Sequence, residues 1–362
     1  MKILHVLNSP KIGGIERFVY YLIKYHIQQN SVSVGLVLGK KEGELRPAFE
    51  DLNVAIYDIE IKPFDFNIKK YKELASISGN YDITHIHSFK PIREFILYKF
   101  GSNVIYTNHT VYGFGRNERK WDAIRRRIFV NYLNRPKLFK TYNSSYTKHF
   151  WETRGVNAQN SIVIENGVAF SSVQKSLTKT SLGLPDKFLV GTSSRLITWK
   201  RVDILIEAFS KFIKECPDSH LVVVGDGPER ESLEKLTKDL NISDQTTFTG
   251  FKTNVEDYQS LMNVCVFPST TESFGLVAIE CMHLGKPVLV MKDGGGITEL
   301  VEKIEPENVT SDNSSLALRL KQLYTNRDSE DQAQHNKRVN YALQFDMKKK
   351  QQEFLSLYQK IL

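Results

Sequence analysis

Short apolar runs alternate with longer amphipathic segments along this chain of 362 residues. The first run, 2–7, has the length of a buried strand, and the segment from about 15 to 28 repeats its apolar residues at helical spacing. A second apolar run follows at 33–38. A strand, a loop, a helix and a strand in this order predict a βαβ unit of a parallel sheet.

The same alternation continues to about residue 170 and predicts a doubly wound parallel sheet in the first half. The further strands are expected at 83–87, 104–107, 139–142 and 162–164.

A polar segment, 171–186, is rich in Ser, Thr and Lys and predicts a linker. The alternating pattern then restarts, with a helix expected at 202–214 and strands at 188–192, 221–224, 247–249, 264–267 and 287–291. At roughly 150 residues per domain, the length favours two domains. We therefore expect an N-terminal domain at 1–170, a C-terminal domain at 187–345, and a final helix at 346–362 that could pack back on the first domain.

The composition is that of a folded protein, with 41% apolar and 25% charged residues. Three cysteines without motif spacing argue against a disulfide framework and fit a reducing compartment. The N-terminal apolar run is too short for a secretory signal, and no stretch approaches the roughly 18 apolar residues that span a bilayer. We expect a cytoplasmic protein, or one bound only at the inner membrane surface.

The net charge of +8 implies an anionic partner, and most of it lies in one segment. Residues 116–140 carry nine basic and two acidic residues, beside an apolar stripe of Trp121, Ile124, Ile128 and Tyr132. A basic amphipathic helix of this kind is typical of membrane-surface binding. Two alternatives are that the stripe packs on the first domain, or that the charges bind an acceptor's phosphates. The candidate membrane or acceptor contacts are Arg116, Arg119, Lys120, Trp121, Arg125, Arg126 and Arg127.

The segment 268–290 combines two glutamates with a predicted helix start. A helix beginning near Phe274 and ending at Gly285 leaves unpaired N–H groups at its first turn, which together with the helix dipole favour a phosphate. Glu272, before the helix, can accept hydrogen bonds from sugar hydroxyls. Glu280, about two turns inside, can reach a ribose diol. The alternative is a buried helix with two incidental glutamates.

A second candidate site is the loop after the strand at 188–192, which holds Arg195 and Lys200. Ligands bind at the carboxyl ends of parallel strands. A diphosphate leaving group gains negative charge as its bond to a sugar breaks, so two fixed cations would stabilise the transition state. The alternative is a solvated basic loop.

These motifs agree in their order along the chain: Arg195 and Lys200, then residues 225–228 (Gly-Asp-Gly-Pro), then Glu272 and Glu280. Together they resemble glycosyltransferase family 4. The resemblance implies a GT-B fold, with two Rossmann-like domains facing a central cleft. It also implies hexosyl transfer from a nucleotide sugar with retention of anomeric configuration and no metal or other cofactor. Consistent with the last point, the chain contains no Asp-x-Asp pair.

The resemblance also implies roles for single residues. Arg195 and Lys200 would bind the donor diphosphate, Glu272 the donor sugar and Glu280 the ribose, while the backbone after Glu272 would hold sugar and phosphate oxygens. The candidate catalytic residues are Arg195, Lys200, Glu272 and His109. The candidate donor contacts are Gly13, Gly14, Arg195, Lys200, Gly225, Glu272, Ser273, Phe274, Gly275, Leu276 and Glu280.

Matches in the first half are sparser. Gly13 and Gly14 open the first helix, where the family has a glycine pair near phosphate, although a simple turn would also need glycine. His109 ends a predicted strand and matches a histidine that the family places near the reacting sugar. The alternative is a structural histidine. His85 and His87 are interpreted as mainly structural, with His87 a candidate for the acceptor side.

The expected partners are a UDP- or GDP-sugar donor, a glycan acceptor of the lipid-linked kind and an anionic membrane surface. The alternatives are a nucleotide-sugar epimerase of the same fold, a glycoside phosphorylase, which would need a pyridoxal-binding lysine, and a dinucleotide oxidoreductase. This chain lacks the Gly-x-Gly-x-x-Gly turn that a dinucleotide oxidoreductase would need after its first strand. Nucleic-acid binding has only the net charge in its favour, and we expect none.

Overall fold

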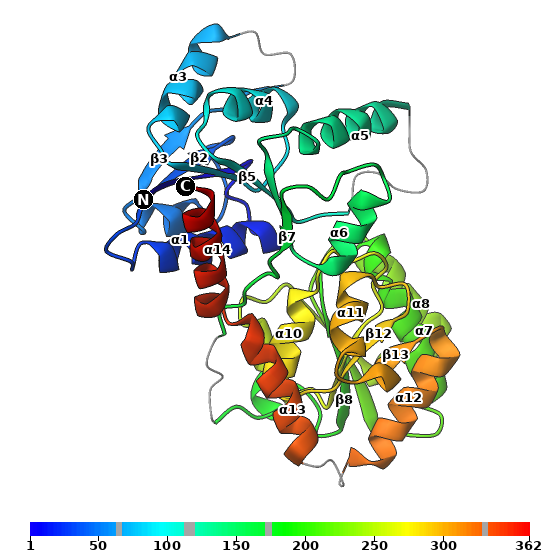
Figure 1. Ribbon diagram of the computed structural model, residues 1–362. Helices are drawn as coiled ribbons and strands as arrows, with labels where there is room; N and C mark the ends of the chain where they lie inside the picture. Colours follow the sequence, from blue (N-terminus) through cyan, green and yellow to red (C-terminus); the bar gives the residue numbers. More distant parts are fainter. Residues whose placement is uncertain (63–66, 112–119, 171–175, 328–331) are drawn as a thin grey trace. The chain divides into compact units, whose positions relative to one another are not determined.

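A computed structural model describes residues 1–62, 67–111, 120–170, 176–327 and 332–362; the side chains of residues 120 and 121 are also outside this description. The chain forms two compact units. Unit 1 comprises Met1–Ala169 with Asp346–Leu362, and unit 2 comprises Phe170–Phe345. Each unit is a parallel sheet flanked by helices (Figure 1), so the predicted α/β fold class is confirmed.

The sheet of unit 1 has the order β3-β2-β1-β4-β5-β6-β7, with every neighbouring pair parallel. Six of its strands were predicted; β3 was missed because it is short and only half-buried at the sheet edge. The strands are β1 Lys2–Leu7, β2 Ser33–Leu38, β3 Ala55–Asp58, β4 Ile83–Ile86, β5 Val104–Asn108, β6 Phe139–Tyr142 and β7 Ser161–Val163.

Two groups of helices cover the two faces of this sheet, because side chains along a strand alternate between faces. Ile3 and Leu7 of β1 pack with α1, α2 and α14, whereas Leu4 and Val6 pack with α3 to α6. The helices are α1 Gly14–His26, α2 Arg46–Glu50, α3 Ile68–Gly79, α4 Pro91–Phe100, α5 Lys120–Leu133, α6 Ser145–Glu152 and α14 Met347–Ile361.

Helix α14 lies beside α1 in Figure 1, far from it in sequence. Phe354 and Tyr358 of α14 are fully buried in the core of unit 1. Burial of such a side chain contributes about 1.5–3 kcal/mol. Since these contacts are within unit 1, the final helix completes the core of the first unit.

The sheet of unit 2 has the order β10-β9-β8-β11-β12-β13 and is also parallel. Its strands are β8 Phe188–Ser193, β9 Ser219–Val224, β10 Thr246–Gly250, β11 Val264–Phe267, β12 Val288–Met291 and β13 Val309–Thr310. Its helices are α7 Val202–Phe212, α8 Arg230–Asp239, α9 Val255–Leu261, α10 Leu276–His283, α11 Gly296–Glu302, α12 Asn313–Thr325 and α13 Gln332–Ala342.

The direction of strand addition reverses once in each sheet. In unit 1 the chain adds β2 and β3 on one side of β1 and then β4 to β7 on the other; in unit 2 the same reversal falls between β8 and β11. Loops at the carboxyl ends of two such strands diverge and leave room for a ligand. The topology therefore places candidate sites after β1 and β4, and after β8 and β11.

Candidate functional site

Lys200 and Glu272 meet at the reversal point of unit 2. Lys200 ends a short 3₁₀ turn, Thr198–Lys200, in the loop after β8, and Glu272 lies in the loop after β11. The Lys200 ammonium donates a hydrogen bond to Glu272 Oε1, and the two side chains are 19% and 15% exposed. The fold thus brings together two residues that sequence motifs had assigned to the same site.

Arg195 lies in the loop after β8, four residues before Trp199, and its side chain is exposed. Within the described residues it makes no hydrogen bond or ion pair, so its guanidinium is available to an anion. Exposed cations at the carboxyl ends of strands suit a phosphate ligand.

The glycines after β9 support the loop that carries Arg195. A Cβ on Gly225 would lie 1.9 Å from the Ser194 carbonyl oxygen, and Gly225 has a φ of 135°. A Cβ on Gly227 would lie 2.3 Å from the Leu196 carbonyl oxygen. Both positions therefore require glycine for close backbone packing. Gly225, a predicted donor contact, has a structural reason to be glycine whether or not it touches a donor.

The backbone on both sides of Glu272 is fixed. The Glu272 N–H donates to the Gly294 carbonyl and the Gly296 N–H donates to the Glu272 carbonyl, each at 2.7 Å. Thr271 has a φ of 55°, which is rare for a β-branched residue and costs on the order of 1–3 kcal/mol. Such local strain is typical of functional loops, where surrounding contacts hold it in place.

Arg201, which the sequence analysis did not single out, connects its own loop after β8 to the loops after β11 and β12. Its guanidinium makes two hydrogen bonds to the Asp293 carboxylate, at 3.0 and 2.5 Å, and its Nε donates to the Pro268 carbonyl at 2.8 Å. The bidentate pair holds the loop after β8 against the loop after β12, and the bond to Pro268 holds it against the loop after β11. The adjacent Lys-Arg pair in the sequence was the available signal, but only the fold identifies the partner.

Helix α10 begins at Leu276, two residues later than predicted, with Gly275 as its N-cap at a φ of 115°. A Cβ on Gly275 would lie 2.6 Å from Ile297 Cγ1. The first N–H groups of α10 have no partner within the helix and can bind an anion. Glu280 is the fifth residue of α10, so the prediction that it lies about two turns inside was wrong; it lies just over one turn inside.

Two neighbours of Glu272 complete the predicted set. Ser273 is half-buried, and Phe274 is buried with its ring centroid 5.8 Å from that of Phe345. The Phe274 side chain is therefore part of the core of unit 2. What remains for a ligand at this residue is its backbone.

In unit 1 the glycine pair occupies the predicted position. Gly13 is the N-cap of α1 and Gly14 its first residue, at the carboxyl end of β1. A Cβ on Gly13 would lie 2.4 Å from Glu16 Oε2, and burial raises the pKa of the Glu16 carboxyl. The carboxylate that such a Cβ would meet is the end of a flexible side chain, so this contact does not by itself require glycine at residue 13.

His109 follows β5 and is buried, with 5% of its surface exposed. Its Nε2 lies 3.1 Å from His87 Nδ1, and His87 Nε2 lies 3.0 Å from His5 Nδ1. Burial lowers the pKa of all three imidazoles, that of His109 to about 3, where an interaction with Asn166 offsets part of the fall. The three rings are therefore neutral near pH 7.

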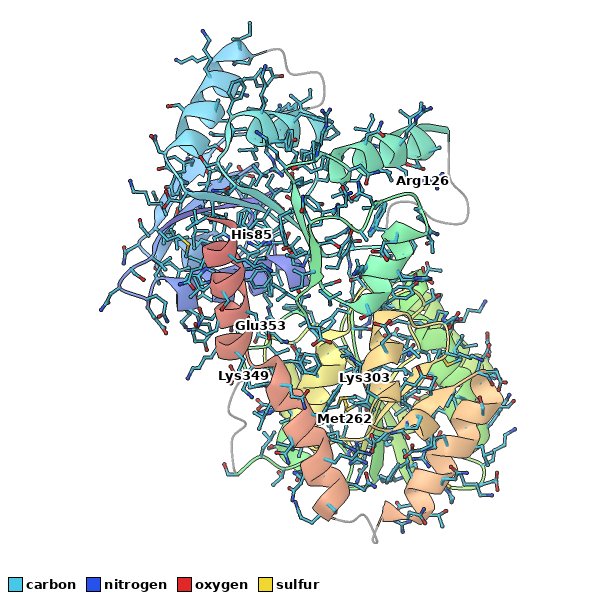
Figure 2. All side chains as sticks on the ribbon, viewed as in Figure 1. His85, Arg126, Met262, Lys303, Lys349 and Glu353 are labelled. Carbon is cyan, nitrogen blue, oxygen red and sulfur yellow. The ribbon has the colours of Figure 1, made fainter. Side chains whose placement is uncertain are left out.

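His85 lies beside α14 in Figure 2 and belongs to the same buried polar seam. Its Nδ1 contacts the Tyr358 hydroxyl at 2.6 Å, and its Nε2 contacts the Thr107 hydroxyl at 2.5 Å. Burial lowers its pKa as well. These bonds support the structural role that the sequence analysis gave to His85.

One group of side chains in the described part of the chain has metal-ligand geometry. His5, His85 and His87 each offer a nitrogen, and these atoms lie within 4.8 Å of one another. Both nitrogens of His85 and both of His87 already contact protein groups, so a metal would have to replace at least one contact of each. Within the described residues, the nitrogens of His85 and His87 are satisfied by protein groups, whereas His5 Nε2 has no hydrogen-bond partner.

The basic segment folds only in part as predicted. On α5, Arg125 and Arg127 are exposed, Arg126 is partly buried and Ile124 is 49% exposed. Arg116 and Arg119, and the side chains of Lys120 and Trp121, lie outside the described residues.

Two residues of the predicted stripe and charge cluster face the core instead. Tyr132 is fully buried among the rings of unit 1, and Lys140 is buried with its Nζ bonded to the Leu133 carbonyl at 3.2 Å and to Asn157 Oδ1 at 2.9 Å. The C-terminal end of the apolar stripe therefore packs on unit 1. Because Lys140 is buried, it is not available to a membrane.

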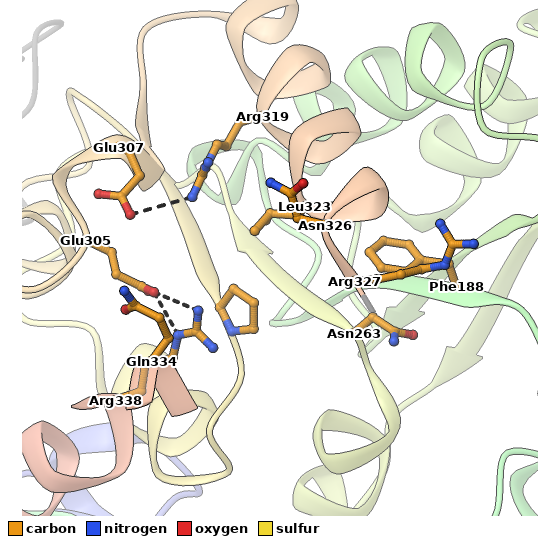
Figure 3. Close-up of a pocket in the computed structure, with 11 residues that line it drawn as sticks. Phe188, Asn263, Glu305, Glu307, Arg319, Leu323, Asn326, Arg327, Gln334 and Arg338 are labelled. Atoms are coloured by element: carbon orange, nitrogen blue, oxygen red, sulfur yellow. Dashed lines mark hydrogen bonds and ion pairs between the residues drawn. The ribbon is translucent and has the colours of Figure 1, made fainter. Parts of the chain in front are cut away.

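A pocket of about 400 Å³ lies at the opposite edge of the sheet of unit 2 (Figure 3). Phe188 begins β8, and Asn263 and Pro287 precede β11 and β12, so the pocket is at the amino ends of these strands. Its charges are largely compensated: Arg338 pairs with Glu305 at 2.7 Å. None of the predicted site residues lines it.

Comparison with known proteins identifies both halves of the chain. Residues 174–340 match the family model of glycosyl transferases group 1, and residues 12–171 match that of glycosyltransferase family 4. Alpha-D-kanosaminyltransferase from Streptomyces kanamyceticus is 33% identical over 136 residues, which are 37% of this chain and 35% of that relative. The chain thus spans about a third of that relative's length. The O-antigen biosynthesis glycosyltransferase WclY from Escherichia coli is 24% identical over 304 residues, 80% of this chain and 79% of WclY.

The solved structure of HepE from Anabaena in complex with UDP superposes with a TM-score of 0.84 at 22% identity, covering 99% of this chain and 100% of HepE. Two parallel-sheet α/β units with this topology define the GT-B class. The chain belongs to glycosyltransferase family 4. The relatives named here are transferases, which disfavours the epimerase alternative. Among the described helices, none has the length and apolar character needed to cross a bilayer.

Proposed function

We propose that the protein is a retaining hexosyltransferase that uses a nucleotide-sugar donor. The observation that carries this proposal is the pairing of Lys200 with Glu272 at the reversal point of unit 2. Arg195, in the same loop as Lys200, has no partner among the described residues. Lys200 and Arg195 would bind the donor diphosphate, the start of α10 its phosphate oxygens, and Glu272 the sugar hydroxyls.

In the proposed reaction the acceptor hydroxyl attacks the anomeric carbon from the face that the diphosphate leaves. The bond from the anomeric carbon to the diphosphate oxygen breaks, and the acceptor proton passes to an oxygen of the leaving diphosphate. Lys200 and Arg195 stabilise the negative charge that develops there. Fixed protein cations supply this stabilisation, so the proposed reaction needs no metal ion or cofactor.

We infer a uridine or guanosine nucleotide in the donor, and the fold shared with the UDP complex of HepE makes UDP-sugars the first to test. For the acceptor we propose a lipid-linked glycan held at the inner membrane surface. Exposed Arg125 and Arg127 on α5 support this, as does a pocket of about 210 Å³ in unit 1. That pocket is lined by Ile61, Lys62, Lys90, Pro91, Ile92, Arg93 and Ile128.

The test is a screen of UDP- and GDP-sugars with lipid-linked acceptors, with and without EDTA, and NMR of the product. Transfer with a retained anomeric configuration and no loss in EDTA supports the proposal. An inverted product, or loss of activity in EDTA that a metal restores, overturns the mechanism. An epimerised nucleotide sugar would favour the epimerase instead. Failure to bind any nucleoside diphosphate would leave only an anion-binding protein.

A further inference from the structure

Asp293 contacts both loops that carry the Lys200–Glu272 pair. Its carboxylate accepts two hydrogen bonds from the Arg201 guanidinium, at 3.0 and 2.5 Å, and Arg201 directly follows Lys200 in the chain. The Asp293 backbone carbonyl accepts a hydrogen bond from the Thr271 N–H at 3.0 Å, and Thr271 directly precedes Glu272. One residue after β12 thus holds a chain neighbour of each member of the pair.

Arg201 and Thr271 share an unusual backbone conformation. Their φ angles are 47° and 55°, in the left-handed region that residues other than glycine rarely adopt. Such a conformation persists only where surrounding contacts hold it. For Thr271 one such contact is the bond to the Asp293 carbonyl, and for Arg201 it is the bridge to the Asp293 carboxylate. Loss of these contacts should therefore let the backbone beside the Lys200–Glu272 pair relax.

The Arg201–Asp293 bridge is only partly buried, with side chains that are 22% and 59% exposed. Exposed ion pairs contribute little to stability, but a bidentate pair of Arg with a carboxylate adds geometric specificity. The Arg201 Nε makes a third bond, to the Pro268 carbonyl at 2.8 Å. Because the guanidinium is planar and rigid, three bonds from it fix its orientation. The bridge is thus better suited to holding the geometry of the loops than to stabilising the fold.

We propose that Asp293 and Arg201 are positioning residues, which hold the Lys200 ammonium and the Glu272 carboxylate in the geometry that sugar transfer needs. A fixed cation stabilises the charge that develops on a leaving diphosphate only if it is in place before the bond breaks. A displacement of about 1 Å can lower a rate about 10²-fold. This inference rests on the proposed function, because it deepens the roles given there to Lys200 and Glu272.

Two variants break the bridge in different ways. Arg201→Gly removes the side chain and leaves a residue that adopts the left-handed conformation without strain, whereas Asp293→Asn keeps the shape and loses the charge. We expect kcat to fall about ten- to hundredfold in each, with the donor KM little changed. Arg201→Lys, which can keep one of the bonds, should recover part of the loss. Asp58→Asn breaks a bidentate pair with Arg46 in unit 1 and is the matched control, with kcat unchanged.

Amide hydrogen exchange of the donor-free protein gives a second reading, which needs no reaction. Exchange in residues 269–273 should be faster in both bridge variants than in wild type or Asp58→Asn, because the loop after β11 is held less firmly. Wild-type kcat and exchange in Arg201→Gly would overturn the proposal, as would a lower free energy of unfolding in urea with kcat per folded molecule unchanged. If the wild type transfers sugar from no donor, the proposed function fails, and faster exchange in the variants would still support the role of the bridge in holding the loops.

Discussion

Lys200 and Glu272 are 72 residues apart in sequence and form a partly buried ion pair at the carboxyl ends of β8 and β11. Each of these side chains has a proposed partner on the donor, the diphosphate for Lys200 and the sugar for Glu272. The pair orients both side chains before a donor arrives. Partial burial strengthens the attraction between the two charges. Loss of either side chain leaves the other with an uncompensated charge in a partly buried site.

Loss of one cation should slow chemistry sharply. Lys200→Ala and Arg195→Ala should each lower kcat by roughly 10²–10³, the loss typical of one group that stabilises charge in the transition state. Steady-state kinetics of sugar transfer measure this. Lys214→Ala, which removes an exposed lysine after α7, is the control. A near-wild-type kcat in either site variant would remove that residue from the proposed site.

The ion pair itself predicts non-additivity. Lys200→Ala leaves the Glu272 carboxylate unpaired near the diphosphate, where it repels the donor. The double variant Lys200→Ala/Glu272→Gln should therefore bind the donor better than the sum of the two single losses allows. Strict additivity of the binding free energies, measured by calorimetry, would show that the two residues act independently.

Loss of Glu280 and loss of Glu272 should weaken the binding of different ligands. Glu280→Ala should weaken binding of the free nucleoside diphosphate, because a ribose contact does not need the sugar. Glu272→Ala should weaken binding of the intact nucleotide sugar more than that of the free nucleotide. Calorimetry with both ligands compares them. Equal losses for both variants would contradict this division of roles.

Unit 1 should lose stability in mild acid. Burial lowers the pKa of His26 to about 4, whereas in the unfolded chain it is about 6.5. Between these values the unfolded state binds more protons, so the free energy of unfolding falls as pH falls below about 6.5, by at most about 3 kcal/mol for this residue. Above that pH the contribution of His26 is constant.

Urea unfolding at about pH 7.5 and about pH 5 measures this difference. His26→Leu removes the titrating group, so its difference between the two pH values should be smaller than that of the wild type. His220→Leu, in unit 2, is the comparison, since burial also lowers the pKa of His220 to about 4. An identical pH dependence in wild type and His26→Leu would show that His26 does not contribute.

Continuous burial explains which elements were predictable. Strands β1, β2 and β11 have the limits expected from the sequence, because strands covered on both faces are short apolar runs. Strand β3 is half-exposed and β13 has two residues, so neither gave such a run. The start of α10 was misplaced because Gly275 turns the chain at a positive φ before the helix begins.

Residues of the candidate site could be predicted only where they belong to a sequence motif. Arg195, Lys200 and Glu272 stood out by their order and spacing. The Arg201–Asp293 bridge and the His5–His87–His109 chain did not, because each depends on which strands and loops become neighbours. Alternation along a strand places His85 and His87 on one face of β4, but only the pairing of β1 with β4 shows that His5 lies opposite His85.

The exposed basic face of α5 gives the last prediction. If Arg125 and Arg127 hold the protein at an anionic leaflet, each contributes on the order of 1 kcal/mol. Arg125→Ser/Arg127→Ser should then lower partitioning onto anionic liposomes about 30-fold at low salt while sparing binding of the soluble donor. Lys235→Ser/Lys238→Ser on α8 removes the same charge from exposed positions of unit 2 and is the matched control. Co-sedimentation of all three proteins, with salt raised to screen the charges, compares them. Equal losses in both variants would mean that net charge alone acts, and a wild type that ignores anionic liposomes at low salt would point to a soluble acceptor.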